Sequence, residues 1–123
     1  ANSPSLESSD PESAAKNRAV LNRLAQTLKK YKSYQVQVEG HANAVLWYDA
    51  ARAQREETED LYPLSLARAQ TIVNELVKVG IEPSRLSAVG RGGKFPIVDP
   101  KKDVELWKRE NWKNRRVEFI LEK

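Results

Sequence analysis

The sequence predicts an α+β fold, a sandwich in which helices pack on one face of a mixed β-sheet. Two long segments repeat apolar residues at the spacing of one helical face, and three short segments have the composition of strands. These elements follow one another as helix, strand, helix, strand, short helix, strand. Such an order indicates a helical layer over one mixed sheet.

The first elements are a loop, a helix and a strand. Residues 1–11 are rich in serine and proline, which favour loops. From about residue 12 to 31 an amphipathic helix is predicted, with an apolar face formed by Val20, Leu21, Leu24, Ala25 and Leu28. Residues 34–39 then alternate aromatic or valine side chains with polar ones, the pattern of a strand with one buried face.

A second helix is predicted over residues 66–79. Its apolar positions have helical spacing, Ser65 is placed to cap its start, and Gly80 is placed to end it. Residues 42–63, before this helix, are the least regular part of the chain, and parts of them are expected to be helical.

Two more strands are predicted, at residues 86–90 and 117–121, with a short helix over residues 103–112 between them. The first helix has the position of a crossover between two parallel strands. A further strand is therefore expected just before Ala1, outside this sequence.

Length and composition fit a single domain over residues 1–123. Its apolar runs are only a few residues long, so any membrane anchor is expected in other parts of a longer protein. With no cysteine and one histidine, the chain has no thiolate zinc site, Cys nucleophile or multi-histidine metal site. We expect no cofactor and no enzymatic activity. The net charge of +4 suits an anionic partner but does not specify one.

Three local patterns have simple structural explanations. Gly90-x-Gly92-Gly93 lacks the spacing of a dinucleotide-binding loop, so a tight turn with positive φ is predicted. His41 has no nucleophile at a diagnostic spacing, and we expect a hydrogen-bonded loop residue. The acidic run at residues 56–60 is expected to be a solvated loop.

Basic residues and tryptophans alternate near the C-terminus, as in surfaces that bind single-stranded nucleic acid. The residues are Trp107, Lys108, Arg109, Trp112, Lys113, Arg115 and Arg116. A solvated basic rim with a tryptophan anchoring a loop is the favoured interpretation, and we expect no nucleic-acid partner.

Arg68 is placed unusually for a cation. If Ser65 is the N-cap, Arg68 lies in the first helical turn, where the helix dipole is already positive. A cation there suits a bound carboxylate, which would also accept bonds from free amides of that turn. A salt bridge to Glu39 or Asp60 is the alternative.

Several separated motifs together resemble the OmpA-like peptidoglycan-binding family. They are Val38-Glu39-Gly40-His41, Leu64-Ser65-Leu66-Ala67-Arg68-Ala69, Arg85-Leu86, Gly90, Pro96 and Asn114-Arg115-Arg116-Val117-Glu118, in that order. The resemblance spans nearly the whole chain and implies the βαβαβ sandwich of that family.

The resemblance also implies a ligand and a site. In that family the domain holds the stem peptide of peptidoglycan noncovalently: an arginine takes the carboxylate of a diamino acid, usually diaminopimelate, and an aspartate takes its ammonium. Arg68 matches that arginine, and backbone amides near Asn2 and Leu66 complete the site, with Arg115 close by. Asn43 stands at the aspartate's position, where loss of a charge-assisted bond costs on the order of 1–2 kcal/mol.

Further departures from the family lie beside this site. Leu61 stands where an asparagine often precedes the Leu-Ser motif, and Asn111 replaces a common arginine. Residues 44–63 form an insertion whose apolar side chains, Trp47 among them, are expected to pack near the pocket mouth with the acidic run outward. The pocket is then either retuned for another diamino acid or muted.

The expected function is therefore noncatalytic binding of peptidoglycan in the periplasm, anchoring an envelope protein to the cell wall. A structural module that has lost this binding and contacts another envelope protein is the alternative.

Overall fold

The computed structural model describes residues 11–123. The elements are α1 (Pro11–Lys30), β1 (Gln35–Gly40), α2 (Ala50–Glu56), the π-helix η1 (Glu57–Leu61), α3 (Tyr62–Lys78), the 3-10 helix η2 (Pro83–Arg85), β2 (Leu86–Gly90), α4 (Val104–Glu110), the 3-10 helix η3 (Asn111–Asn114) and β3 (Val117–Glu122). The predicted loop over residues 1–11 lies outside the described residues, except that Pro11 already begins α1. No helix among the described residues has the length and apolar character needed to cross a bilayer.

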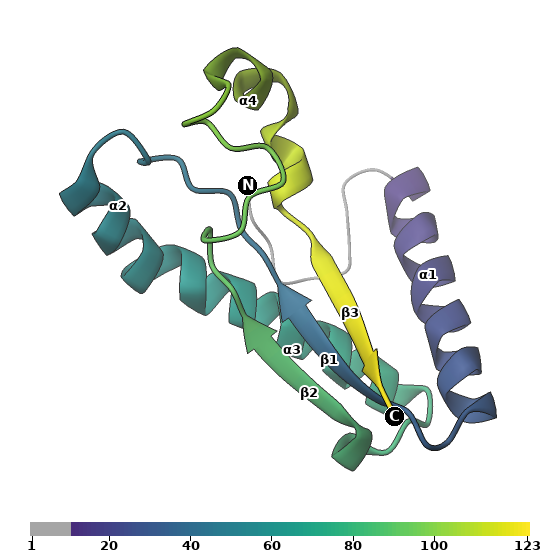
Figure 1. The fold of residues 1–123 in the computed structure, drawn as a ribbon. Helices are drawn as coiled ribbons and strands as arrows, with labels where there is room; N and C mark the ends of the chain where they lie inside the picture. The colour runs from purple at the N-terminus through teal and green to yellow at the C-terminus, as the bar shows by residue number, and fades with distance from the viewer. Residues whose placement is uncertain (1–10) are drawn as a thin grey trace.

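The described strands form one mixed sheet in the order β2-β1-β3. β1 runs parallel to β2 and antiparallel to β3, with Val38 opposite Ala88 on one side and Phe119 on the other. Figure 1 shows α3 crossing behind the sheet while α1 runs beside β3. The predicted α+β fold with helices over a mixed sheet is confirmed, and the strand predicted at residues 86–90 has the observed bounds.

The hydrophobic core lies between the two long helices and the inward face of β1. Val36 and Val38 of β1 are buried, and so are Leu28 of α1 and Leu76 of α3. Burying each such side chain contributes roughly 1.5–3 kcal/mol. The remaining core members are Ala25, Ala69, Ile72, Val73 and Ile81.

Two glycines let α3 lie close to the sheet. A Cβ placed on Gly40, at the end of β1, would lie 2.0 Å from the carbonyl oxygen of Ser65. A Cβ on Gly90, at the end of β2, would lie 2.9 Å from Cβ of Leu66. No side chain fits at Gly40, because the obstructing atom belongs to the backbone.

The predicted helix start at Leu66 is wrong. α2, η1 and α3 follow one another without a break, and Ser65 lies inside α3 with its Oγ donating to Tyr62 O at 2.9 Å. The capped end is instead at Asp49, whose Oδ1 accepts from the Arg52 amide at 3.1 Å. Because Ser65 is fully buried, it lies against the rest of the fold and not at a solvated helix end.

The C-terminal half follows the predictions more closely. Gly80 ends α3 with φ of +103°, a conformation that glycine adopts without strain. Asp103 caps α4 through its Oδ1, which accepts from the Leu106 amide at 3.0 Å. The helix predicted over residues 103–112 corresponds to α4 and part of η3.

Candidate functional site

The candidate site lies at the end of the sheet where β1 and β2 finish and β3 begins (Figure 1). Residues 41–43 leave β1 there and are held by two backbone bonds, from His41 N to Arg116 O and from Ala42 N to Gly92 O, both 2.8 Å. The segment therefore has its path fixed by its neighbours on both sides.

Arg68 reaches this segment from α3. Its Nη1 donates to the carbonyl oxygen of His41 at 2.7 Å. Burial lowers the pKa of Arg68, and the positive charge of Arg115 lowers it further. The cation predicted for the site is thus in place, but it lies inside α3 and not in a first helical turn.

Asn43 is buried and its amide oxygen is occupied. Oδ1 accepts from Trp107 Nε1 at 3.1 Å and from Asn114 Nδ2 at 3.0 Å. Asn114 is held in turn by Val98, whose N–H donates to Oδ1 at 2.9 Å and whose carbonyl accepts from Nδ2 at 2.9 Å. Asn43 therefore ties β1 to the segment that leads into β3.

The other predicted site residues have different outcomes. Arg115 is exposed and acts on Arg68 through its charge. Leu66 lies inside α3, so its amide is directed to the preceding helical turn, and the predicted free amide there is wrong. Leu61 is buried, and its Cδ1 lies 3.0 Å from where a Cβ on Gly93 would be. Asn2 lies outside the described residues.

The glycine loop after β2 is fastened to the long helix. Gly92 has φ of +56°, as predicted for the turn, and its N–H donates to Ser65 Oγ at 2.8 Å. The Gly93 N–H donates to Glu57 Oε1 at 2.8 Å. Ser65 and Glu57 therefore set the distance between this loop and the helix.

The acidic run at residues 56–60 is not the solvated loop that we expected. It is helical, and two of its carboxylates bind backbone amides. Glu57 binds Gly93, and Glu56 accepts from the amides of Val45 and Leu46 at 3.0–3.2 Å. The contacts of Glu56 fold residues 44–56 back on themselves.

The insertion does reach the site, as predicted for Trp47. The rings of Trp47 and Trp107 meet edge to face with centroids 6.0 Å apart. Trp107 in turn donates to Asn43. The insertion thus supports the side chain that occupies the amide oxygen of Asn43.

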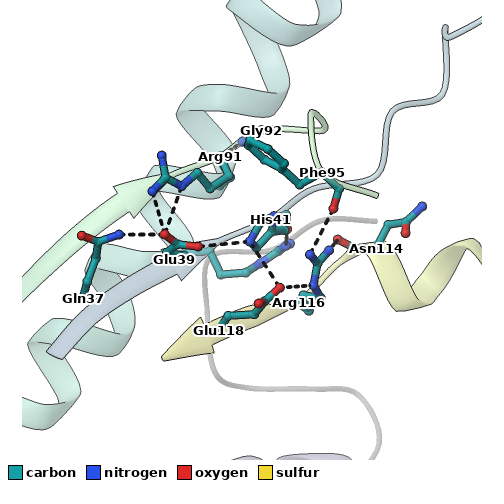
Figure 2. Close-up of polar contacts among 11 residues, drawn as sticks. Gln37, Glu39, His41, Arg91, Gly92, Phe95, Asn114, Arg116 and Glu118 are labelled. Carbon is teal, nitrogen blue, oxygen red and sulfur yellow. Dashed lines mark hydrogen bonds and ion pairs between the residues drawn. The ribbon is translucent and has the colours of Figure 1, made fainter. Parts of the chain in front are cut away.

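A cluster of charged side chains around buried Glu39 and His41 lies beside the site (Figure 2). Glu39 accepts from Arg91 Nη2 at 2.7 Å, so it does not form the salt bridge to Arg68 considered from the sequence. The hydrogen bond from Arg91 is the main reason that the pKa of Glu39 lies below its usual range. Arg116 donates to Glu118 at 2.6 Å.

His41 lies between these two pairs. Its Nε2 is 3.5 Å from Glu118 Oε2 and 3.8 Å from Glu39 Oε1. Within residues 11–123 both ring nitrogens are buried without a hydrogen-bond partner, so the hydrogen bonds of His41 are made by its backbone N–H and carbonyl. Burial is the largest cause of a lowered His41 pKa, followed by the charge of Arg116.

The basic and aromatic residues near the C-terminus do not form a continuous stacking surface. Trp107 is engaged by Asn43 and Trp47, whereas Trp112 is exposed with Lys113 over its ring. Among residues 11–123, no group of three or more histidine or acidic side chains is arranged to hold a metal ion.

Trp107, Ser65 and Glu57 are the residues that sequence reasoning missed at this site. For Trp107 the sequence indicates either nucleic-acid stacking or a loop anchor, and for Ser65 it indicates a helix cap within a family motif. The sequence has no local signal for their contacts, because their partners lie 64 and 27 positions away along the chain, and that of Glu57 lies 36 away.

Comparisons with known proteins agree with this architecture. The C-terminal domain of Helicobacter pylori MotB is 21% identical, with a TM-score of 0.70 over 100% of this chain and 80% of that chain. The peptidoglycan-associated lipoprotein from Burkholderia pseudomallei is 20% identical, with a TM-score of 0.67 over 96% and 83%. A putative MotB-like protein from Desulfovibrio vulgaris is 28% identical, with a TM-score of 0.66 over 97% of this chain and 64% of that one.

No curated protein matches the chain. Residues 9–110 match the profile of the OmpA family. This match covers α1, β1, residues 44–63, the helix that holds Arg68, β2 and α4, whereas Asn114 and Arg115 lie beyond it. The chain therefore belongs to the OmpA family.

Proposed function

We propose that this chain is a noncatalytic domain that anchors a larger envelope protein to the cell wall by holding peptidoglycan. The stem peptide would bind in the periplasm at the end of the sheet, against Arg68, Arg115 and Asn43. Any attachment to a membrane would come from other parts of the full-length protein, and another envelope protein would be a further partner.

The arrangement of two guanidinium groups carries this proposal. Arg68 is partly buried against residues 41–43, and the nearby charge of Arg115 disfavours its protonated form. Like charges held together repel, and a carboxylate placed between them relieves that repulsion while accepting charge-assisted hydrogen bonds. Family membership and the name of one solved neighbour, a peptidoglycan-associated lipoprotein, support a wall ligand.

Cosedimentation with purified sacculi tests the proposal. Arg68→Ala should weaken binding by about 1.5–3 kcal/mol, the range for a hydrogen bond to a charged group, or about 10- to 150-fold. Arg23→Ala is the matched control, because Arg23 is exposed on α1 and its substitution removes the same charge away from the site. Equal loss in both variants would mean that only net charge matters.

A structural module without wall binding is the second candidate. Two observations favour it: the oxygen of Asn43 already accepts two hydrogen bonds, and Leu61 is buried. Neither group is therefore available to a ligand. Absence of wild-type protein from the sacculus pellet at low salt would establish this alternative.

A further inference from the structure

The orientation of the Asn43 amide follows from its partners. Trp107 Nε1 is only a donor, so the group that faces it must be the oxygen of Asn43. Asn114 is fixed in the same way, because the Val98 N–H requires an oxygen and the Val98 carbonyl requires an NH₂ group. The Asn114 NH₂ therefore faces the oxygen of Asn43.

An amide oxygen has two acceptor positions, and in Asn43 both are used. What remains of this side chain is its NH₂ group, which makes no hydrogen bond to the part of the chain that the structure describes. That group can only donate. Asn43 therefore offers nothing to a ligand ammonium, the group that an aspartate at this position would bind.

The three side chains that the proposed function places against the ligand, Arg68, Arg115 and Asn43, are thus all donors. Arg68 and Arg115 are cations without acceptor atoms, and Asn43 adds neutral N–H groups. The nearby carboxylates are engaged elsewhere or buried: Glu39 pairs with Arg91, and Glu118 pairs with Arg116. Glu57 accepts from the Gly93 amide through Oε1, and its Oε2 is buried. Such a set complements an anion and repels a cation.

We infer that this site recognises a carboxylate and is indifferent to an ammonium group beside it. The inference rests on the proposed function and deepens it, because it names the chemical class of the group that is bound. The ligand would be a wall peptide whose side chain ends in a free carboxylate, with or without an amine on the same carbon.

Asn43→Asp reverses this selectivity with little change of shape. One carboxylate oxygen can accept from both Trp107 and Asn114, since each oxygen has two acceptor positions. The second oxygen then stands where the NH₂ group was. The variant exchanges a donor for a charged acceptor at one atom and restores an ammonium site.

The experiment is calorimetric titration of wild type and Asn43→Asp with three tripeptides. The first ends in diaminopimelate, the second has the side-chain carboxylate amidated, and the third has the side-chain ammonium replaced by hydrogen. For the wild type we expect amidation to weaken binding at least about tenfold and loss of the ammonium to change it less than about twofold. For Asn43→Asp, loss of the ammonium should weaken binding about tenfold.

The outcomes separate this inference from the proposed function. Wild-type binding that falls equally on removal of either group, or that ignores amidation, overturns carboxylate selectivity while leaving wall binding intact. No binding of any tripeptide or of sacculi overturns both. Should Asn43→Asp fail to fold, Trp107→Phe serves in its place: it keeps a ring against Trp47 and frees one acceptor position of Asn43, so the ammonium should begin to strengthen binding.

Discussion

Asn114→Ala tests whether the link between β1 and β3 depends on one buried amide. Asn114 is 1% exposed and makes three hydrogen bonds, two with the backbone of Val98 and one with Asn43. Alanine leaves the buried N–H and carbonyl of Val98 without these partners. Each unsatisfied buried group costs about 1–3 kcal/mol, and water entering the vacated space offsets part of this, so we expect a loss of about 2–4 kcal/mol.

Urea unfolding followed by circular dichroism measures this loss, provided that the m-value stays unchanged. Asn74→Ala is the matched control: Asn74 is exposed on α3, and its side chain accepts only from exposed Gln70. Its effect should stay within about 0.5 kcal/mol. A destabilisation below about 1 kcal/mol for Asn114→Ala would show that these hydrogen bonds are replaced by water at no net cost, and would refute the reasoning.

Three more predictions concern the packing and titration around the site. Gly40→Ala should prevent native packing of α3, because its Cβ would lie 2.0 Å from the Ser65 carbonyl oxygen; a melting temperature within a few degrees of wild type would contradict this. Gly92→Ala should cost at least about 1–2 kcal/mol in chemical unfolding, since φ is +56° and the added carbon meets the Glu57 carboxylate. The pKa of His41 lies below 6.5 in the folded state, so the unfolded chain binds more protons than the folded one as the pH falls. The free energy of unfolding should therefore decrease between pH 7 and pH 5, and it should decrease less in His41→Gln. Parallel pH curves for the two proteins would remove His41 as the cause.

The sequence by itself determined the elements whose signals are local. The strand at residues 86–90 is a short run between turn residues, and Gly80 marks the end of α3 because only glycine adopts its positive φ without strain. The helix with apolar residues at helical spacing from Leu21 to Leu28 likewise needs no distant contact to be recognised. The motif alone makes Arg68 a candidate site residue.

The tertiary structure decided where the second helix begins. Serine is a residue type that commonly caps helices, yet Ser65 is fully buried and its Oγ accepts from the Gly92 N–H. Leu61, at the end of the π-helical turn, is buried against Gly93. Ser65 and Leu61 both contact the loop after β2, and a helix that continues through residues 50–78 allows both contacts at once. The stability gained from these contacts outweighs the local preference of serine for a helix end.

The chemistry of Asn43 was also decided by the tertiary structure. From the sequence, this side chain is a weaker acceptor that replaces an aspartate. In the fold, Trp107 and Asn114 occupy its oxygen, although they lie 64 and 71 positions further along the chain. Whether an amide offers its oxygen or its nitrogen to a ligand depends on which of its atoms the neighbouring side chains already occupy. Only the packing of α4 and η3 beside residues 41–43 brings Trp107 and Asn114 to the oxygen of Asn43.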